Sequence, residues 1–166
     1  EHTSRGLGDV YKRQDPYVEK EKIKISGAIP VDNISENLQK MDAVTLHCPK
    51  NDETTDLFTK KEFNLMKKSS FIINCARGGI LNEEDLYEAL KNENISGAGL
   101  DVFDVEPTPS SNPLFKLNNV ILSPHIAGVT VESTVRMATE TVQNVLDVLD
   151  NKINQSVVVN NKEIGI

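Results

Sequence analysis

Side chains that can bind an acid and move a proton follow several apolar segments of this sequence. They are His47, Arg77, the acidic residues between Asp101 and Glu106, and His125. The apolar segments before them are typical of buried strands, and the carboxyl ends of parallel strands lie at one edge of a sheet. We therefore expect these polar residues to converge at that edge, where open α/β sheets bind their ligands.

Three of these residues suit the reduction of a 2-keto acid. Arg77 keeps its charge at any working pH and can hold a carboxylate with two parallel hydrogen bonds, while Gly78 and Gly79 allow a close approach. His125 can give or take a proton near neutral pH, and Glu106 would orient the imidazole and favour its protonated form. No side chain supplies a hydride, so this interpretation requires a cofactor.

Each residue also has a structural alternative. Arg77 could be a surface arginine at the end of a strand, and His125 could be a structural histidine in a loop. Glu106 could be a solvated acid, and Asp101 could be a turn former. His47 is interpreted as a hydrogen-bonded core histidine. Their expected convergence on one edge is the feature that these alternatives leave unexplained.

The elements that must position these residues alternate along the chain. Strands are predicted over residues 43–48, 70–75, 95–102 and 120–122. Capping residues predict helices that begin after Asn33, Thr59, Asn82 and Thr130, the third ending near residue 92 and the last near residue 150. This alternation predicts an α/β fold with a Rossmann-like, doubly wound parallel sheet that is truncated at the N-terminus.

Composition excludes several classes of protein. The 166 residues fit one domain, and 38% hydrophobic with 26% charged residues is a globular composition. The net charge of −7 argues against a nucleic-acid or anionic membrane surface, and no apolar run approaches the roughly 20 residues of a membrane helix. Cys48 and Cys75 are interpreted as small core residues of a cytoplasmic protein, without a disulfide or a metal site.

Residues 1–14 differ in character from the rest of the chain. Gly6-Leu7-Gly8 is similar to the start of a dinucleotide-binding loop, but Asp15 follows too soon to leave room for the helix that such a loop requires. The segment that ends at Gln14 also resembles translated adapter sequence. We therefore predict that residues 1–14 are non-native or disordered.

Ordered motifs in the chain resemble the signatures of NAD-dependent D-2-hydroxyacid dehydrogenases. They are Asn-Cys-Ala-Arg-Gly-Gly from Asn74, Leu-Asp-Val-Phe-Asp-Val-Glu-Pro from Leu100, and Ser-Pro-His-Ile-Ala-Gly from Ser123. The resemblance runs from Asp15 to about Val159. It implies a partial NAD-binding domain over residues 15–150 and a tail over residues 151–166 that leads back toward an absent substrate domain.

The resemblance also implies roles for individual residues. Arg77 would anchor the substrate carboxylate, His125 would be the acid/base, and Glu106 would be its partner. Asp15 would receive the adenosine ribose hydroxyls, and because no arginine follows it, NAD is favoured over NADP. The residues expected to line the cofactor are Asp15, Cys48, Pro49, Thr54, Cys75, Ala76, Arg77, Asp101, His125 and Gly128.

The function that the resemblance implies is hydride transfer between NAD(H) and a D-2-hydroxy acid or 2-keto acid. The overall run is most similar to the phosphoglycerate dehydrogenase and hydroxypyruvate reductase members, and a homodimer is expected for the full-length protein. Two alternatives remain open. One is a corepressor-like scaffold that binds NAD without metabolic catalysis. The other is an inactive fragment, because the glycine fingerprint and the substrate domain are expected before Asp15.

Overall fold

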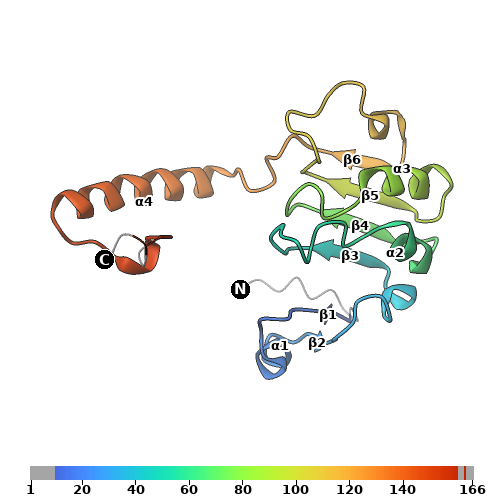
Figure 1. Cartoon of the computed structure of the whole chain (residues 1–166), viewed down its shortest axis with the longest axis horizontal. Helices are drawn as coiled ribbons and strands as arrows, with labels where there is room; N and C mark the ends of the chain where they lie inside the picture. Colours follow the sequence, from blue (N-terminus) through green and yellow to red (C-terminus); the bar gives the residue numbers. More distant parts are fainter. Residues whose placement is uncertain (1–9, 161–162, 164–166) are drawn as a thin grey trace. The chain divides into compact units, whose positions relative to one another are not determined.

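The chain forms two compact units in the computed structural model, which describes residues 10–160 and residue 163. The first unit is Glu1–Pro124 and the second is His125–Ile166. The described part of the first unit contains two parallel sheets with their helices, and that of the second contains one long helix and a short 3-10 turn (Figure 1).

A four-stranded parallel sheet organises the first unit (Figure 1). Its strands follow the order β3-β4-β5-β6, with β3 at Ala43–Leu46, β4 at Phe71–Asn74, β5 at Gly97–Leu100 and β6 at Val120–Leu122. Helix α2 (Lys60–Leu65) connects β3 to β4, and helix α3 (Glu83–Lys91) connects β4 to β5. The α/β class and the four strands are therefore as predicted, although β3, β4 and β5 are shorter than predicted by one or two residues at an end.

The core lies on the side of the sheet that α2 and α3 cover. Val44 and Ile72 are buried on this face, and Phe63 of α2 and Leu86 of α3 belong to the same apolar cluster. Successive side chains of a strand point to opposite faces of the sheet. Phe71, which precedes Ile72 in β4, therefore points away from the core and is 48% exposed.

A second, two-stranded sheet lies before the main one in the sequence. Strand β1 (Lys12–Arg13) pairs in parallel with β2 (Ile29–Pro30), and helix α1 (Lys20–Ile25) connects them. Within residues 1–14, which are predicted to be non-native or disordered, Lys12 and Arg13 form a strand held by the Val31 N–H to Arg13 carbonyl bond of 2.9 Å. Gly6-Leu7-Gly8 lie outside the described residues.

Three helices are capped by the residues that predict where they begin. Glu62 accepts the Thr59 N–H at 3.2 Å, the Asn82 side chain accepts the Asp85 N–H at 3.1 Å, and Thr130 accepts the Ser133 N–H at 3.1 Å. These three helices begin where they were predicted to begin.

The prediction of a helix after Asn33 was wrong. Only a 3-10 turn, η1 (Leu38–Lys40), forms in this region, followed by extended backbone at Met41. The Asn33 side chain accepts the Ser35 N–H at 2.9 Å, and the Asn37 side chain donates to the Asn33 carbonyl at 2.9 Å. Such bonds between side chains and backbone compete with helix formation.

The second unit is dominated by helix α4 (Val131–Leu149), with a 3-10 turn, η3 (Gln155–Val157), after it. Apolar side chains form a stripe along α4, and its large members are more than half exposed: Val131, Val135, Val142, Val145 and Leu149. Within the described residues, no helix is long and apolar enough to pass through a bilayer.

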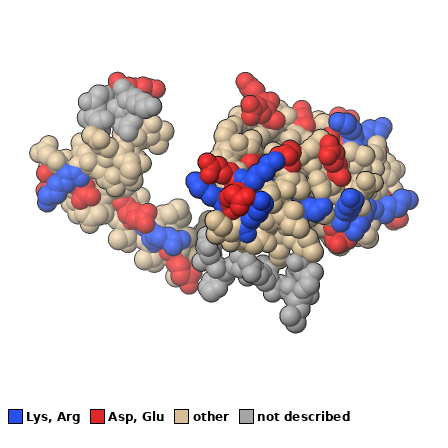
Figure 2. Space-filling view, turned by 90° about the horizontal axis from the view of Figure 1, so that it is seen from below, with Lys and Arg blue, Asp and Glu red and all other residues tan. Residues whose placement is uncertain are grey.

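Charged side chains of both signs are mixed on the face of the first unit shown in Figure 2. One of the ion pairs joins Lys67 to Asp42 at 2.6 Å. On the described residues of this face, no continuous basic patch of the kind that attracts a phosphate backbone is visible (Figure 2).

Candidate active site

The loops that follow β3, β4 and β5 share one edge of the first unit, because these strands run parallel (Figure 1). The first loop carries Lys50, the second carries Arg77, and the third carries Asp101 and Glu106. The structure thus places Arg77, Asp101 and Glu106 at one edge of the sheet, as the sequence predicts.

Two glycines allow these loops to touch. A Cβ added to Gly78 would overlap the Phe103 carbonyl oxygen and lie 2.9 Å from the Asp104 nitrogen, so the loops after β4 and β5 meet backbone to backbone. Gly79 has a φ of +75°, and a Cβ there would overlap the Lys50 ammonium group. The loop that presents Arg77 is therefore packed between the loops on either side of it.

Arg77 is exposed at this edge, and a buried asparagine shapes its loop. Asn74 is 2% exposed, donates from Nδ2 to the Arg77 carbonyl at 2.9 Å, and accepts the Ala76 N–H at 3.0 Å. The Arg77 guanidinium donates to the Ala76 carbonyl at 2.6 Å. Asn74 belongs to one of the sequence motifs without a predicted role of its own, and the structure shows that it fixes the turn.

Asp101 is buried rather than at a surface turn. Its side chain accepts a hydrogen bond from the Ser123 hydroxyl at 2.6 Å, and its N–H donates to the Asn74 carbonyl at 3.0 Å. The residue is 2% exposed. Asp101 therefore joins the ends of β4, β5 and β6, and Ser123 is a partner that the sequence analysis did not identify.

Glu106 and His125 belong to different units of the structure. Glu106 is exposed at the edge and accepts the Phe103 N–H at 2.9 Å. His125 opens the second unit with a φ of 55°, a left-handed conformation that is uncommon for residues other than glycine. The pairing of Glu106 with His125 stays a prediction.

Two expectations about buried residues were wrong. His47 is exposed and shares a 2.9 Å hydrogen bond with the Thr45 hydroxyl, because both residues follow the outward alternation of β3. Cys75 is also exposed, since it comes directly after the buried Asn74. Cys48 is partly buried against the core as expected, and this burial raises the pKa of its thiol.

The other predicted cofactor residues lie mostly in loops of the first unit. Thr54 donates from its hydroxyl to the Pro49 carbonyl at 2.6 Å and so closes the loop after β3. Ala76 is partly buried beside Arg77, whereas Gly128 lies in the second unit.

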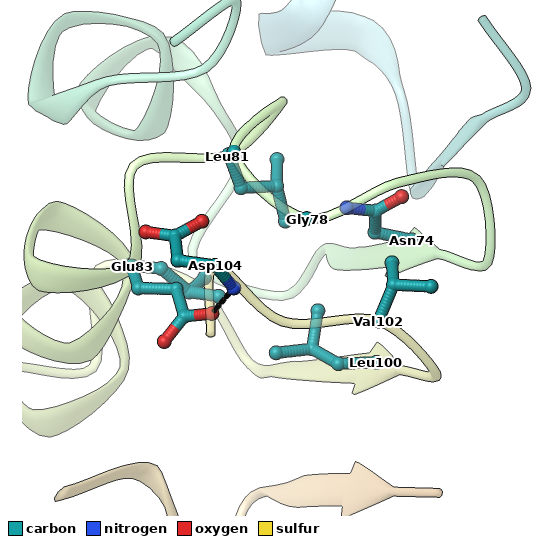
Figure 3. A pocket seen from close by; sticks show the side chains of 9 residues that line it. Asn74, Gly78, Leu81, Glu83, Leu100, Val102 and Asp104 are labelled. Atoms are coloured by element: carbon teal, nitrogen blue, oxygen red, sulfur yellow. Dashed lines mark hydrogen bonds between the residues drawn. The ribbon is translucent and has the colours of Figure 1, made fainter. Parts of the chain in front are cut away.

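A small cavity of about 10 Å³ lies behind these loops. Figure 3 shows Glu83 and Asp104 side by side on its wall, with Gly78 and Leu81 close to them. A cavity of this size holds at most about one water molecule. It is therefore part of the packing between loops and is too small for a substrate.

The pKa of the Asp104 carboxyl group is raised at this position. Partial burial raises the pKa of its carboxyl group, and the nearby negative charges of Glu83 and Asp56 raise it further. The Gly79 N–H and the Lys50 ammonium group act in the opposite direction. The folded chain thus binds a proton at Asp104 more readily than the unfolded chain does.

Replacing Asp104 with asparagine is expected to stabilise the fold at pH 7. Because the folded-state pKa is raised, ionised Asp104 favours unfolding at neutral pH, and this effect disappears below the ordinary pKa of 3.8. Urea unfolding of Asp104→Asn and the parent chain should therefore differ at pH 7 and converge near pH 3. A parent chain that is more stable than the variant at pH 7 would contradict this assignment.

The described residues fit a dinucleotide at this edge. A side-chain hydrogen bond from Arg13 and the Tyr17 N–H lower the pKa of Asp15, so its carboxylate stays ionised. Carboxylate oxygens carry two acceptor sites each, which leaves capacity for ribose hydroxyls.

Comparisons with known proteins agree that this chain contains a dinucleotide-binding fold. The family described as "D-isomer specific 2-hydroxyacid dehydrogenase, NAD binding domain" matches residues 9–127 of the chain. The match begins within residues 1–14, which differ in character from the rest of the chain.

The chain is also similar to individual proteins. It is 41% identical over 144 residues to the D-3-phosphoglycerate dehydrogenase of Methanocaldococcus jannaschii, a match that covers 87% of this chain and 27% of that protein. It is 42% identical over 127 residues to the glyoxylate reductase of Thermofilum pendens, covering 76% and 37%.

A solved structure shows the same fold. The D-isomer specific 2-hydroxyacid dehydrogenase from Lactobacillus delbrueckii ssp. bulgaricus, in its NAD complexed form, superposes with a TM-score of 0.82 at 28% identity, covering 92% of this chain and 49% of that chain. The chain spans 27% and 37% of the length of the two curated relatives. The parallel sheets with flanking helices are therefore Rossmann-like, as predicted. This chain belongs to the D-isomer specific 2-hydroxyacid dehydrogenase family, and residues 9–127 match the NAD-binding domain of that family.

Proposed function

We propose that this chain is the cofactor-binding part of an oxidoreductase that acts on a D-2-hydroxy acid and the corresponding 2-keto acid. The observation that carries the proposal is the exposed Arg77 guanidinium at the carboxyl edge of the sheet, on a loop held by buried Asn74. Asp101 and Glu106 share this edge. Membership of the family supports the same reaction class.

In this proposal each residue has one task. Arg77 holds the substrate carboxylate through parallel hydrogen bonds, which orients the carbonyl carbon toward the cofactor. His125 donates a proton to the carbonyl oxygen during reduction and takes it back during oxidation. Glu106 orients the imidazole and stabilises its protonated form. The bound NAD(H) supplies or accepts the hydride.

The substrate class can be proposed more narrowly from the relatives. Their names divide between D-3-phosphoglycerate dehydrogenase and glyoxylate reductase at similar identity. We propose a 3-phosphoglycerate dehydrogenase-like activity first and reduction of glyoxylate or hydroxypyruvate second. We also propose that residues 15–150 form the cofactor-binding part, that residues 151–166 lead toward a substrate domain, and that the complete enzyme is a cytoplasmic homodimer.

A chimera tests whether these residues support catalysis. The matching segment of this chain would replace the corresponding 144 residues of the Methanocaldococcus jannaschii relative. We expect the chimera to oxidise NADH in the presence of 2-keto acids. Binding of NADH without turnover of any 2-keto acid, in a chimera that is folded, would reject the proposed function.

Substituting Arg77 in the chimera tests its role as the carboxylate anchor. A hydrogen bond to a charged group contributes about 1.5 to 3 kcal/mol, so Arg77→Ala is expected to raise the KM for the keto acid about 10- to 100-fold. The KM for NADH should change much less. Lys68→Ala is the matched control, because it removes an exposed positive charge just before β4, away from the carboxyl edge. Equal effects of the two substitutions would count against the anchor.

A further inference from the structure

Glu83 makes two hydrogen bonds that the reaction described above does not use. It is the first residue of α3, and one carboxylate oxygen accepts the Asp104 N–H at 2.6 Å. The other oxygen accepts from the Asn112 side chain at 3.1 Å. Figure 3 shows the first of these bonds, with Glu83 reaching from α3 to the loop after β5. One carboxylate thus holds both ends of the segment that contains Glu106.

The two ends of this segment are fixed, whereas its middle is exposed. Phe103 is 6% exposed, and Asn112 is 9% exposed and accepts the Leu114 N–H at 2.9 Å. Glu106 lies between them, exposed, and its Oε1 accepts the Phe103 N–H at 2.9 Å. The Phe103 amide is therefore one contact that orients the Glu106 side chain, and it is next to the amide that Glu83 holds.

Glu83 lies in the first turn of α3 and its charge faces Asp104. This charge contributes to the raised pKa of the Asp104 carboxyl group, with Lys50 and Asp56 as the other charges acting on Asp104. The two carboxylate oxygens of Glu83 serve different partners, the Asp104 N–H and the Asn112 side chain.

We propose that Glu83 is a positioning residue for Glu106. Its carboxylate ties residues 104 and 112 to the start of α3, and this fixes the Phe103 amide that holds the Glu106 side chain at the carboxyl edge. The inference rests on the proposed function, in which Glu106 orients the catalytic histidine. It adds a residue on a neighbouring helix that acts only through Glu106.

Amide hydrogen exchange in the 166-residue chain tests the contact directly. Glu83→Ala is expected to speed exchange at the Asp104 and Phe103 amides about 10- to 100-fold, the range for loss of a hydrogen bond to a charged group. Glu83→Gln should restore part of the protection, since its amide oxygen still accepts one bond. Glu84→Ala, which removes an exposed charge from the same helical turn, should leave both amides unchanged.

The pattern of exchange distinguishes positioning from a general loss of stability. Amides of β4 and β5, such as those of Ile72 and Ala98, should keep their exchange rates in Glu83→Ala. Unchanged protection at Phe103 would overturn the proposal, and so would equal acceleration across the sheet.

Kinetics in the chimera separate this proposal from the proposed function. Glu83→Ala should lower kcat and displace its pH profile, with little change in the KM for NADH. A chimera that is active and whose kcat pH profile is unaffected by Glu83→Ala would overturn the positioning role while the proposed function stands. An inactive chimera with the expected exchange pattern would reject the proposed function and leave the contact between Glu83 and the loop intact.

Discussion

Replacing Gly78 with alanine is expected to lower the free energy of unfolding by about 3 kcal/mol or more, the upper range for overpacking. The added Cβ would overlap the carbonyl oxygen and carbon of Phe103. Neither of these atoms belongs to a flexible side chain, so one of the two loops would have to move. Because domains of this size are stable by about 5 to 15 kcal/mol, the loss is a large fraction of the total.

Urea unfolding followed by circular dichroism measures this loss, and the chain contains a matched control. Gly99 lies in β5, and a Cβ added there would be 3.8 Å from Ile73, an ordinary van der Waals distance. Glycine within a strand costs about 0.5 to 1 kcal/mol relative to alanine, so Gly99→Ala should be neutral or stabilising. Equal destabilisation by the two variants would show that the contact between Gly78 and Phe103 is not what matters.

Removing the imidazole of His125 is expected to lower kcat of the chimera about 10²- to 10⁴-fold, the usual contribution of a positioned acid/base. The expectation follows from the proposed function, in which this side chain protonates the carbonyl oxygen. The variant must respect the backbone, because His125 has a φ of 55°. Asparagine tolerates this conformation better than alanine, so His125→Asn removes the acid/base with the least added strain.

Three measurements distinguish loss of the acid/base from loss of cofactor binding or of folding stability. The loss in kcat should come with an altered pH profile, because the group proposed to transfer the proton is gone. Binding of NADH should persist, and the unfolding free energy of His125→Asn should match that of the parent chimera. If kcat of this variant equals that of the parent, His125 is not the acid/base.

Local sequence signals located most of the elements. The caps at Thr59, Asn82 and Thr130 were recognisable because each bond joins residues three apart, and neighbours in sequence determine such bonds. The same local reasoning failed after Asn33, where side-chain bonds favour turns over a helix. It also missed β1 and β2, because each is only two residues long.

The sequence by itself determined the class of fold, the family, and the position of Arg77, Asp101 and Glu106 at the carboxyl edge. Those conclusions depend on strand alternation, on motifs that are continuous in the chain, and on the rule that parallel strands end together. They did not require knowledge of which side chains touch.

The tertiary structure decided which residues hold that edge in place. Asn74 with Arg77 is a short-range contact, but Ser123 with Asp101, Glu83 with Asn112, and Gly78 with Phe103 join residues more than 20 positions apart. It also decided that His47 and Cys75 face outward. Such contacts depend on how strands pair and how loops pack, which residue types alone do not specify.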